Sequence, residues 1–166
     1  MSSVTKRQHA VKSRAIEHTP AGAVLTDLII PVIQLEAHFS RAGESIAATA
    51  GQTLARWLTL EMVANEPATV AQIAKRLNLA RQSVQRIADL LAQDRLTEYV
   101  DNPDHRTSRL VRLTPQGHQT LRSIQASQRE WSNRIGARIG ESGLRQASSV
   151  VAKLTRALLE ERAVRS

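Results

Sequence analysis

The sequence predicts a mainly α-helical protein with a small β wing: a winged helix-turn-helix flanked by N- and C-terminal dimerisation helices. Apolar residues make up 42% of the 166 residues but aromatic residues only 2%, so aliphatic side chains must build the core. Such a core suits packed helices better than a β-sandwich. The stretch Thr69–Gly117 then shows, in order, two helical patterns joined by a tight turn and two strand patterns joined by a charged loop. This order is typical of modules that place one helix in the major groove of DNA.

The composition excludes several classes of protein. The chain contains no cysteine, which excludes disulfides, thiolate metal sites and cysteine redox switches. No uninterrupted apolar run approaches the roughly 18 residues expected of a membrane span. The basic residues near the N-terminus are not followed by the apolar core of a secretory signal. We therefore expect one cytoplasmic domain with no membrane partner.

The net charge of +8 is concentrated near both ends of the chain and in Thr69–Gly117. A polyanionic partner such as nucleic acid explains this distribution, and a solvated basic surface is the alternative. Residues 1–22 are predicted to form a basic flexible arm. The arm either contacts DNA phosphates, reaches a second subunit, or is a disordered tail.

Two helices are predicted before the central stretch. The first, from Thr26 to about Ser45, has an apolar stripe too wide for one neighbour, which favours an oligomer interface over burial within the monomer. Pro31 is expected to kink this helix or to mark its true start. The second runs from Gln52 to Asn65, and we interpret Trp57 within it as a core residue.

The helix-turn-helix begins at Thr69. The hydroxyl of Thr69 and the amide of Gln72 have the spacing of a capping box, and Asn78 tolerates the left-handed conformation that ends a helix. Only residues 78–80 separate this helix from the next. A turn this short forces the two helices to cross steeply.

The fourth helix, from about Arg81 to Gln93, is predicted to bury Val84, Ile87, Leu90 and Leu91. Glutamine pairs with adenine and arginine with guanine, and both types lie in the first two turns, where bases are within reach. A polar face that merely contacts solvent is the alternative. The predicted DNA contacts on this helix are Arg81, Gln82, Ser83, Gln85 and Arg86.

A β-hairpin is predicted from Leu96–Val100 and Arg109–Leu113, and the loop between them has turn chemistry. Arg106 near its tip is placed to enter a minor groove, with Asp104 orienting its guanidinium. The alternative is a hairpin with an incidental salt bridge. The predicted contacts of this wing are Asp104, His105, Arg106, Thr107 and Arg109.

Two long helices close the chain. Thr114 and Pro115 have the residue types of an N-cap and a first helical position. Gly140 breaks the apolar pattern, and a sixth helix is expected from Ser142. Their shared apolar seam is suited to continue into a partner chain.

No pattern indicates an enzyme. The five histidines have no metal-ligand spacing, and neither a glycine-rich phosphate loop nor a nucleophile elbow is present. We therefore expect no catalytic activity, no metal and no cofactor.

Specific motifs in this chain resemble those of the MarR family of bacterial transcriptional regulators over residues 24–162. Asp104-His105-Arg106 and Leu113–Gly117 are similar to the family's D-x-R wing signature and its L-T-x-x-G helix start. Thr69–Leu77 and Arg81–Arg86 match the two helices of its helix-turn-helix. Ala80 departs from the family pattern, because it lacks the side-chain acceptor that usually caps the recognition helix.

The resemblance implies a homodimeric repressor on a palindromic operator. The single domain would span 23–166, with the DNA-binding lobe at about 50–114 and dimerisation helices at about 24–45 and 115–164. It also implies a small aromatic or phenolic effector, bound where the dimerisation helices meet this lobe. The residues matched to that crevice are His38, Arg41, Arg56, Trp57 and His118. A winged helix used for protein–protein contact, without specific DNA binding, is the alternative function.

Overall fold

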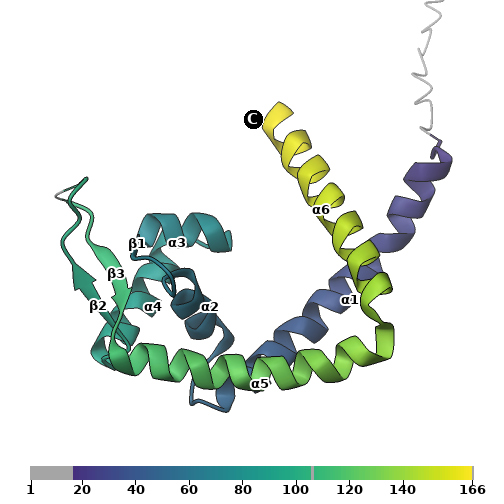
Figure 1. Ribbon diagram of the computed structural model, residues 1–166. Coiled ribbons are helices and arrows are strands. Elements are labelled where there is room, and N and C mark those ends of the chain that lie inside the picture. The colour runs from purple at the N-terminus through teal and green to yellow at the C-terminus, as the bar shows by residue number, and fades with distance from the viewer. Residues whose placement is uncertain (1–16, 106, 166) are drawn as a thin grey trace, which may run out of the picture. The chain divides into compact units, whose positions relative to one another are not determined.

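The computed structural model in Figure 1 describes residues 17–105 and 107–165. The contacts divide the chain into two units, residues 1–39 and 40–166. Arg106 and most of the predicted basic arm (1–16) lie outside the described residues.

Helix α1 (Pro20–Ala48) runs through both units: residues 20–39 belong to the first unit and residues 40–48 to the second. It begins before the predicted start at Thr26, so residues 20–22 of the predicted arm are helical. Pro31 lies inside α1 and does not end it. The large apolar side chains of α1 up to Phe39 are exposed: Val24, Leu25, Leu28, Ile29, Ile30, Val32, Ile33, Leu35 and Phe39.

Helix α1 is also long and apolar enough to cross a membrane, with a mean hydropathy of 1.3 over its best window. It is the one helix of this kind within the described residues. The sequence shows no uninterrupted apolar run here, because Asp27 and Glu36 lie within the helix. Since core helices of soluble proteins pass the same test, one such helix is weak evidence for a membrane span.

The second unit contains the hydrophobic core. Helices α2 (Leu54–Met62), α3 (Val70–Leu77) and α4 (Arg81–Gln93) pack against a small sheet and the first turns of α5 (Pro115–Ile139). Helix α6 (Glu141–Val164) follows α5 after Gly140. The largest fully buried side chains are Leu60, Ile73, Leu91, Ile124, Val84, Val111 and Thr59. Trp57 is buried in this core, as the sequence predicted.

The sheet is antiparallel, with the strand order β1-β3-β2. Strands β2 (Thr97–Val100) and β3 (Leu110–Leu113) form the predicted hairpin, with Thr97 opposite Leu113 and Val100 opposite Leu110. Strand β1 (Ala68–Thr69) adds two residues on the other side of β3. Strand β1 was not predicted, because two residues are too few for an alternating pattern.

The prediction that Leu90 is buried was wrong. Leu90 is 41% exposed, and Ala88 is buried in its place. The helix turns its narrow apolar side toward α2 and α3, so Ala88 lies between Val84 and Leu91 on the core side. Leu90 therefore belongs to the outer surface of α4.

Candidate nucleic-acid interface

The α3–α4 corner is held by its own side chains. Thr69 caps α3: its hydroxyl accepts from the Gln72 backbone at 3.2 Å, and the Gln72 side chain accepts from the Thr69 backbone at 2.8 Å. Asn78 ends α3 in the left-handed conformation, with φ of 53°. These local features confirm the predicted capping box and turn. They fix α4 as the second helix of a helix-turn-helix.

The outer face of α4 carries the five predicted DNA contacts. All five are exposed, and Ala80, which precedes them, makes no side-chain capping bond. A shallow groove of about 490 Å³ runs along this face. It is lined by Arg81, Gln82, Gln85, Arg86, Asp89, Leu90 and Gln93.

Tyr99 joins α4 to the wing. Its hydroxyl donates to Asp89 Oδ1 at 2.7 Å, and the Gln85 side-chain amide donates to the same hydroxyl at 2.8 Å. The guanidinium of Arg109 lies 5.4 Å from the centre of the Tyr99 ring, a cation–π distance. Burial, and after it the hydrogen bond to Asp89, raises the pKa of Tyr99 to about 12. The hydroxyl therefore keeps its proton to a higher pH than an ordinary tyrosine, whose pKa is 10.0.

The wing loop is closed by Asn102. Its side-chain amide donates to the Ser108 carbonyl at 2.9 Å, and its side-chain oxygen accepts from the Asp104 backbone at 3.0 Å. The predicted wing residues Asp104, His105 and Thr107 are exposed. The predicted Asp104–Arg106 pair falls partly outside the described residues and stays a prediction.

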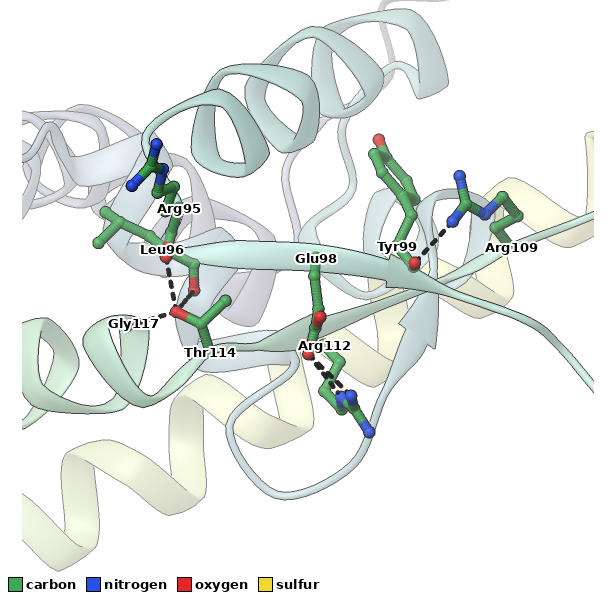
Figure 2. Close-up of polar contacts among 8 residues, drawn as sticks. All are labelled: Arg95, Leu96, Glu98, Tyr99, Arg109, Arg112, Thr114 and Gly117. Carbon is green, nitrogen blue, oxygen red and sulfur yellow. Dashed lines mark hydrogen bonds and ion pairs between the residues drawn. The ribbon is translucent and has the colours of Figure 1, made fainter.

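Arg109 is turned back onto the hairpin. It donates to the Tyr99 carbonyl at 2.6 Å, and Figure 2 shows the two side chains on the same side of the sheet. On the other side, Glu98 forms an ion pair with Arg112 at 2.7 Å. Because neighbouring residues of a strand point to opposite faces, Tyr99 lies on the face toward α4 and Glu98 on the face away from it.

The wing is fastened to α5 by Thr114. Its hydroxyl accepts from the Gly117 backbone at 3.0 Å and donates to the Arg95 carbonyl at 2.6 Å, as Figure 2 shows. Gly117 lies so close to Leu96 that a Cβ atom at residue 117 would be 1.9 Å from the Leu96 carbonyl oxygen. The L-T-x-x-G motif therefore has a structural cause: a hydroxyl bridge, followed by a position where only hydrogen fits.

The predicted ligand residues do not gather into one site within the second unit. Trp57 is in the core, and Arg56 is bonded to Asp94 and to Gln52. His118 is exposed on α5, and Arg41 on α1. His38 belongs to the first unit.

A different set of residues forms a groove between the end of α1 and α5. Its volume is about 410 Å³, and Thr49 and Ser127 meet across it with their hydroxyl oxygens 3.1 Å apart. An aromatic ring and a guanidinium, those of Trp131 and Arg134, lie in one wall. The groove is lined by Ala42, Ser45, Ile46, Thr49, Ser127, Glu130, Trp131 and Arg134.

Sequence reasoning missed Tyr99, Asn102 and the groove residues. Tyr99 is the single tyrosine of the chain, and its place in a strand beside the recognition helix was an available signal. The hydrogen bond from Tyr99 to Asp89 could not be predicted from the sequence, because it depends on the packing of β2 against α4. Among residues 17–105 and 107–165, no group of histidine and carboxylate side chains could hold a metal ion.

Comparison with known proteins agrees with this geometry. A profile of the MarR family matches residues 50–106. Uncharacterized proteins of Mycobacterium tuberculosis and Mycobacterium bovis are 37% identical over 135 residues, which is 81% of this chain and 94% of each relative.

Solved structures have the same fold. The crystal structure of a MarR family transcription regulator has a TM-score of 0.72 and 25% identity, covering 84% of this chain and 96% of that one. Staphylococcus aureus MarR in complex with salicylate and kanamycin has a TM-score of 0.74 at 17% identity, covering 84% and 95%. CouR of Rhodococcus jostii, bound to p-coumaroyl-CoA, has a TM-score of 0.70 at 14% identity, covering 77% and 91%. The chain therefore belongs to the MarR family of DNA-binding transcriptional regulators.

Proposed function

We propose that this regulator is a homodimeric repressor that binds a palindromic operator and responds to a small aromatic ligand. The observation that carries the proposal is the exposed polar face of α4, which lies beside a wing fixed to it through Tyr99. A recognition helix and a wing held together can contact a major groove and the adjacent minor groove at once.

Within this proposal the residues of α4 have distinct tasks. Gln82, Ser83, Gln85 and Arg86 contact base edges or nearby phosphates, and Arg81 contacts the backbone at the start of the helix. Arg106 anchors the wing in the minor groove, with Asp104, His105, Thr107 and Arg109 supporting it or touching phosphates. Arg109 is already bonded to the Tyr99 carbonyl, so it holds a fixed position in the wing.

The second subunit is proposed from exposed apolar surface. Besides the α1 side chains up to Phe39, α6 exposes five large apolar side chains at 50% or more: Val150, Val151, Leu158, Leu159 and Val164. Soluble monomers rarely expose apolar surface on this scale. A second copy of the chain covers both helices and sets the spacing of the two recognition helices.

A ligand is proposed for the groove between α1 and α5. Salicylate and p-coumaroyl-CoA, named in the structures of two relatives, both contain an aromatic ring and an acidic group. In this groove Trp131 would contact the ring and Arg134 the acidic group, which in salicylate is a carboxylate. Titration with salicylate, followed by tryptophan fluorescence, tests this placement. Equal affinity of Arg134→Gln and the unmodified protein would contradict it.

The central experiment is selection of bound duplexes from a random pool, followed by gel shifts at graded salt. The proposal predicts one preferred palindromic duplex, with affinity that falls steeply as salt rises. Arg86→Ala should weaken binding to that duplex by about 1–3 kcal/mol and relax the preference at one base pair. An equal loss on random DNA would make Arg86 a phosphate contact only.

Two further measurements test the remaining parts. Light scattering should give twice the mass of one chain. In a transcription assay, the protein should lower output from a promoter containing the selected duplex, and ligand should restore it. If no duplex is preferred and binding is insensitive to salt, the alternative of a protein–protein interaction module gains support instead.

A further inference from the structure

Three groups form a closed set of hydrogen bonds on the DNA-facing side of the lobe. The side-chain nitrogen of Gln85 lies 2.9 Å from Asp89 Oδ1 and 2.8 Å from the Tyr99 hydroxyl. The Tyr99 hydroxyl lies 2.7 Å from the same Asp89 oxygen. We call Asp89 and Tyr99 the clamp, because together they hold the amide of Gln85.

The clamp fixes which way round the Gln85 amide lies. An ionised carboxylate only accepts hydrogen bonds. The hydroxyl of Tyr99 donates to Asp89, so toward Gln85 it accepts. Both partners therefore require the nitrogen of Gln85. A flipped amide would set its oxygen against two acceptors, with no hydrogen between them.

The carbonyl oxygen of Gln85 is thus the atom left for a partner outside the protein. No hydrogen bond to it occurs within residues 17–105 and 107–165. Gln85 is exposed and lines the groove along the outer face of α4. It lies one turn from Asp89 on the same helix face, where side chains four apart meet.

The clamp is itself held in place. The Tyr99 ring is partly buried, with the Arg109 guanidinium over it, and Arg109 also donates to the Tyr99 carbonyl at 2.6 Å. Tyr99 keeps its hydroxyl proton at neutral pH, since its ordinary pKa of 10.0 already lies above 7 and burial and Asp89 raise it further. The orientation of Gln85 is therefore set before any DNA is bound.

We propose that the clamp makes Gln85 an acceptor-only contact that selects an amino base, adenine or cytosine, over a keto base at one position on one strand of each half-site. Adenine N6 and cytosine N4 present hydrogen-bond donors in the major groove, whereas guanine O6 and thymine O4 present acceptors. Asp89 and Tyr99 are positioning residues in this scheme. The inference rests on the DNA-binding function proposed above and adds its base preference.

The test is duplex selection by four variants beside the unmodified protein. Gln85→Ala identifies the position that Gln85 contacts. There the unmodified protein should accept adenine and cytosine alike and bind guanine or thymine roughly 5- to 100-fold more weakly. We call the affinity for adenine or cytosine divided by that for guanine or thymine the amino-to-keto ratio. In Asp89→Asn the new amide can donate as well as accept, so Gln85 can flip and this ratio should fall to about twofold. Tyr99→Phe keeps the ring under Arg109 and should give an intermediate ratio.

Glu98→Gln is the matched control. Glu98 is the neighbour of Tyr99 on β2 but bonds to Arg112 on the opposite face of the hairpin. Its replacement changes the charge of the lobe as Asp89→Asn does, and it should leave the amino-to-keto ratio unchanged. A general loss of affinity alters all duplexes equally, so the ratio separates positioning from a merely structural role.

Other outcomes would overturn the inference. Selection of adenine alone would show that Gln85 also offers its nitrogen, and an unchanged ratio in both clamp variants would show that the clamp does not orient it. A preferred duplex in which no position of the half-site accepts both adenine and cytosine on one strand contradicts this inference and leaves the proposed function standing. Failure to prefer any duplex contradicts both.

Discussion

Replacing Gly117 by alanine tests whether the start of α5 is as tightly fastened to the wing as the structure shows. The added Cβ would lie 1.9 Å from the Leu96 carbonyl oxygen and 2.9 Å from its carbon. Close carbon–oxygen contacts in proteins are about 3.3 Å or longer. Both obstructing atoms are backbone, so no side-chain rotation relieves the contact. The first turn of α5 must move away from Leu96 by roughly 1.4 Å.

The magnitude follows from the bonds that this movement breaks. The Thr114 backbone donates to Leu96 at 3.1 Å, and the Thr114 hydroxyl donates to Arg95 at 2.6 Å. Two such bonds contribute about 1–3 kcal/mol together, and forcing a group into a filled space costs about 1–3 kcal/mol. Because alanine favours the helical conformation more than glycine does, the substitution offsets up to about 1 kcal/mol of this loss. We expect a net loss of about 2–4 kcal/mol.

Urea unfolding at one fixed protein concentration measures this loss, because a dimer's stability depends on concentration. The midpoint should fall by about 1–2 M. Gly136→Ala is the control in the same helix: its Cβ would have only Leu144 nearby, at 3.8 Å. That variant should be unchanged or more stable by up to about 1 kcal/mol. Equal midpoints for the two variants would refute the argument from the Leu96 contact.

Three other predictions concern single side chains. Among the described residues, the Thr97 hydroxyl is a buried oxygen with no partner; Thr97→Val should raise the unfolding free energy by about 1–3 kcal/mol, and a loss would indicate a hidden partner. Ala80→Ser supplies the missing cap of α4 and should add about 1 kcal/mol; no gain would mean that the first turn is already satisfied. Tyr99 is the only tyrosine, so its ultraviolet titration should have a midpoint near 12 when folded and near 10.0 in urea. Because the pKa of Tyr99 is higher in the folded than in the unfolded protein, stability should fall as pH rises from 10 toward 12. Asp89→Asn should lower the titration midpoint of the folded protein, and an unchanged midpoint would show that Asp89 does not raise the pKa.

The helix-turn-helix could be predicted from sequence because local signals specify it. Thr69 with Gln72 forms its capping box within four residues, and Asn78 adopts the left-handed turn that its side chain favours. The bounds of α4 match the prediction, Arg81 to Gln93. Each of these features depends on residues close together in the chain, so no knowledge of the packing was needed.

Features that depend on packing between distant segments were missed. Leu90 fits the apolar spacing of α4 as well as Ala88 does, and only the position of α2 and α3 decides which is covered. The groove between α1 and α5 was missed for the same reason, because Thr49 and Ser127, which meet across it, are far apart in the sequence. The ligand residues were predicted by matching positions to the MarR family. That matching carries no information about the shape of this groove, so it could not identify the residues that line it.

Helix α5 connects the two parts of the proposed mechanism within one continuous helix. Its first turn is bonded to the base of the wing through Thr114 and Gly117, and its middle supplies Trp131 and Arg134 to the groove. A ligand that moves the middle of α5 would therefore carry the wing with it, since the close Gly117–Leu96 contact resists approach and the two Thr114 bonds resist separation. The wing in turn carries Tyr99, which holds Gln85 on α4. A ligand would thus act on the wing and the recognition helix together, provided that it prefers one position of α5 over the other.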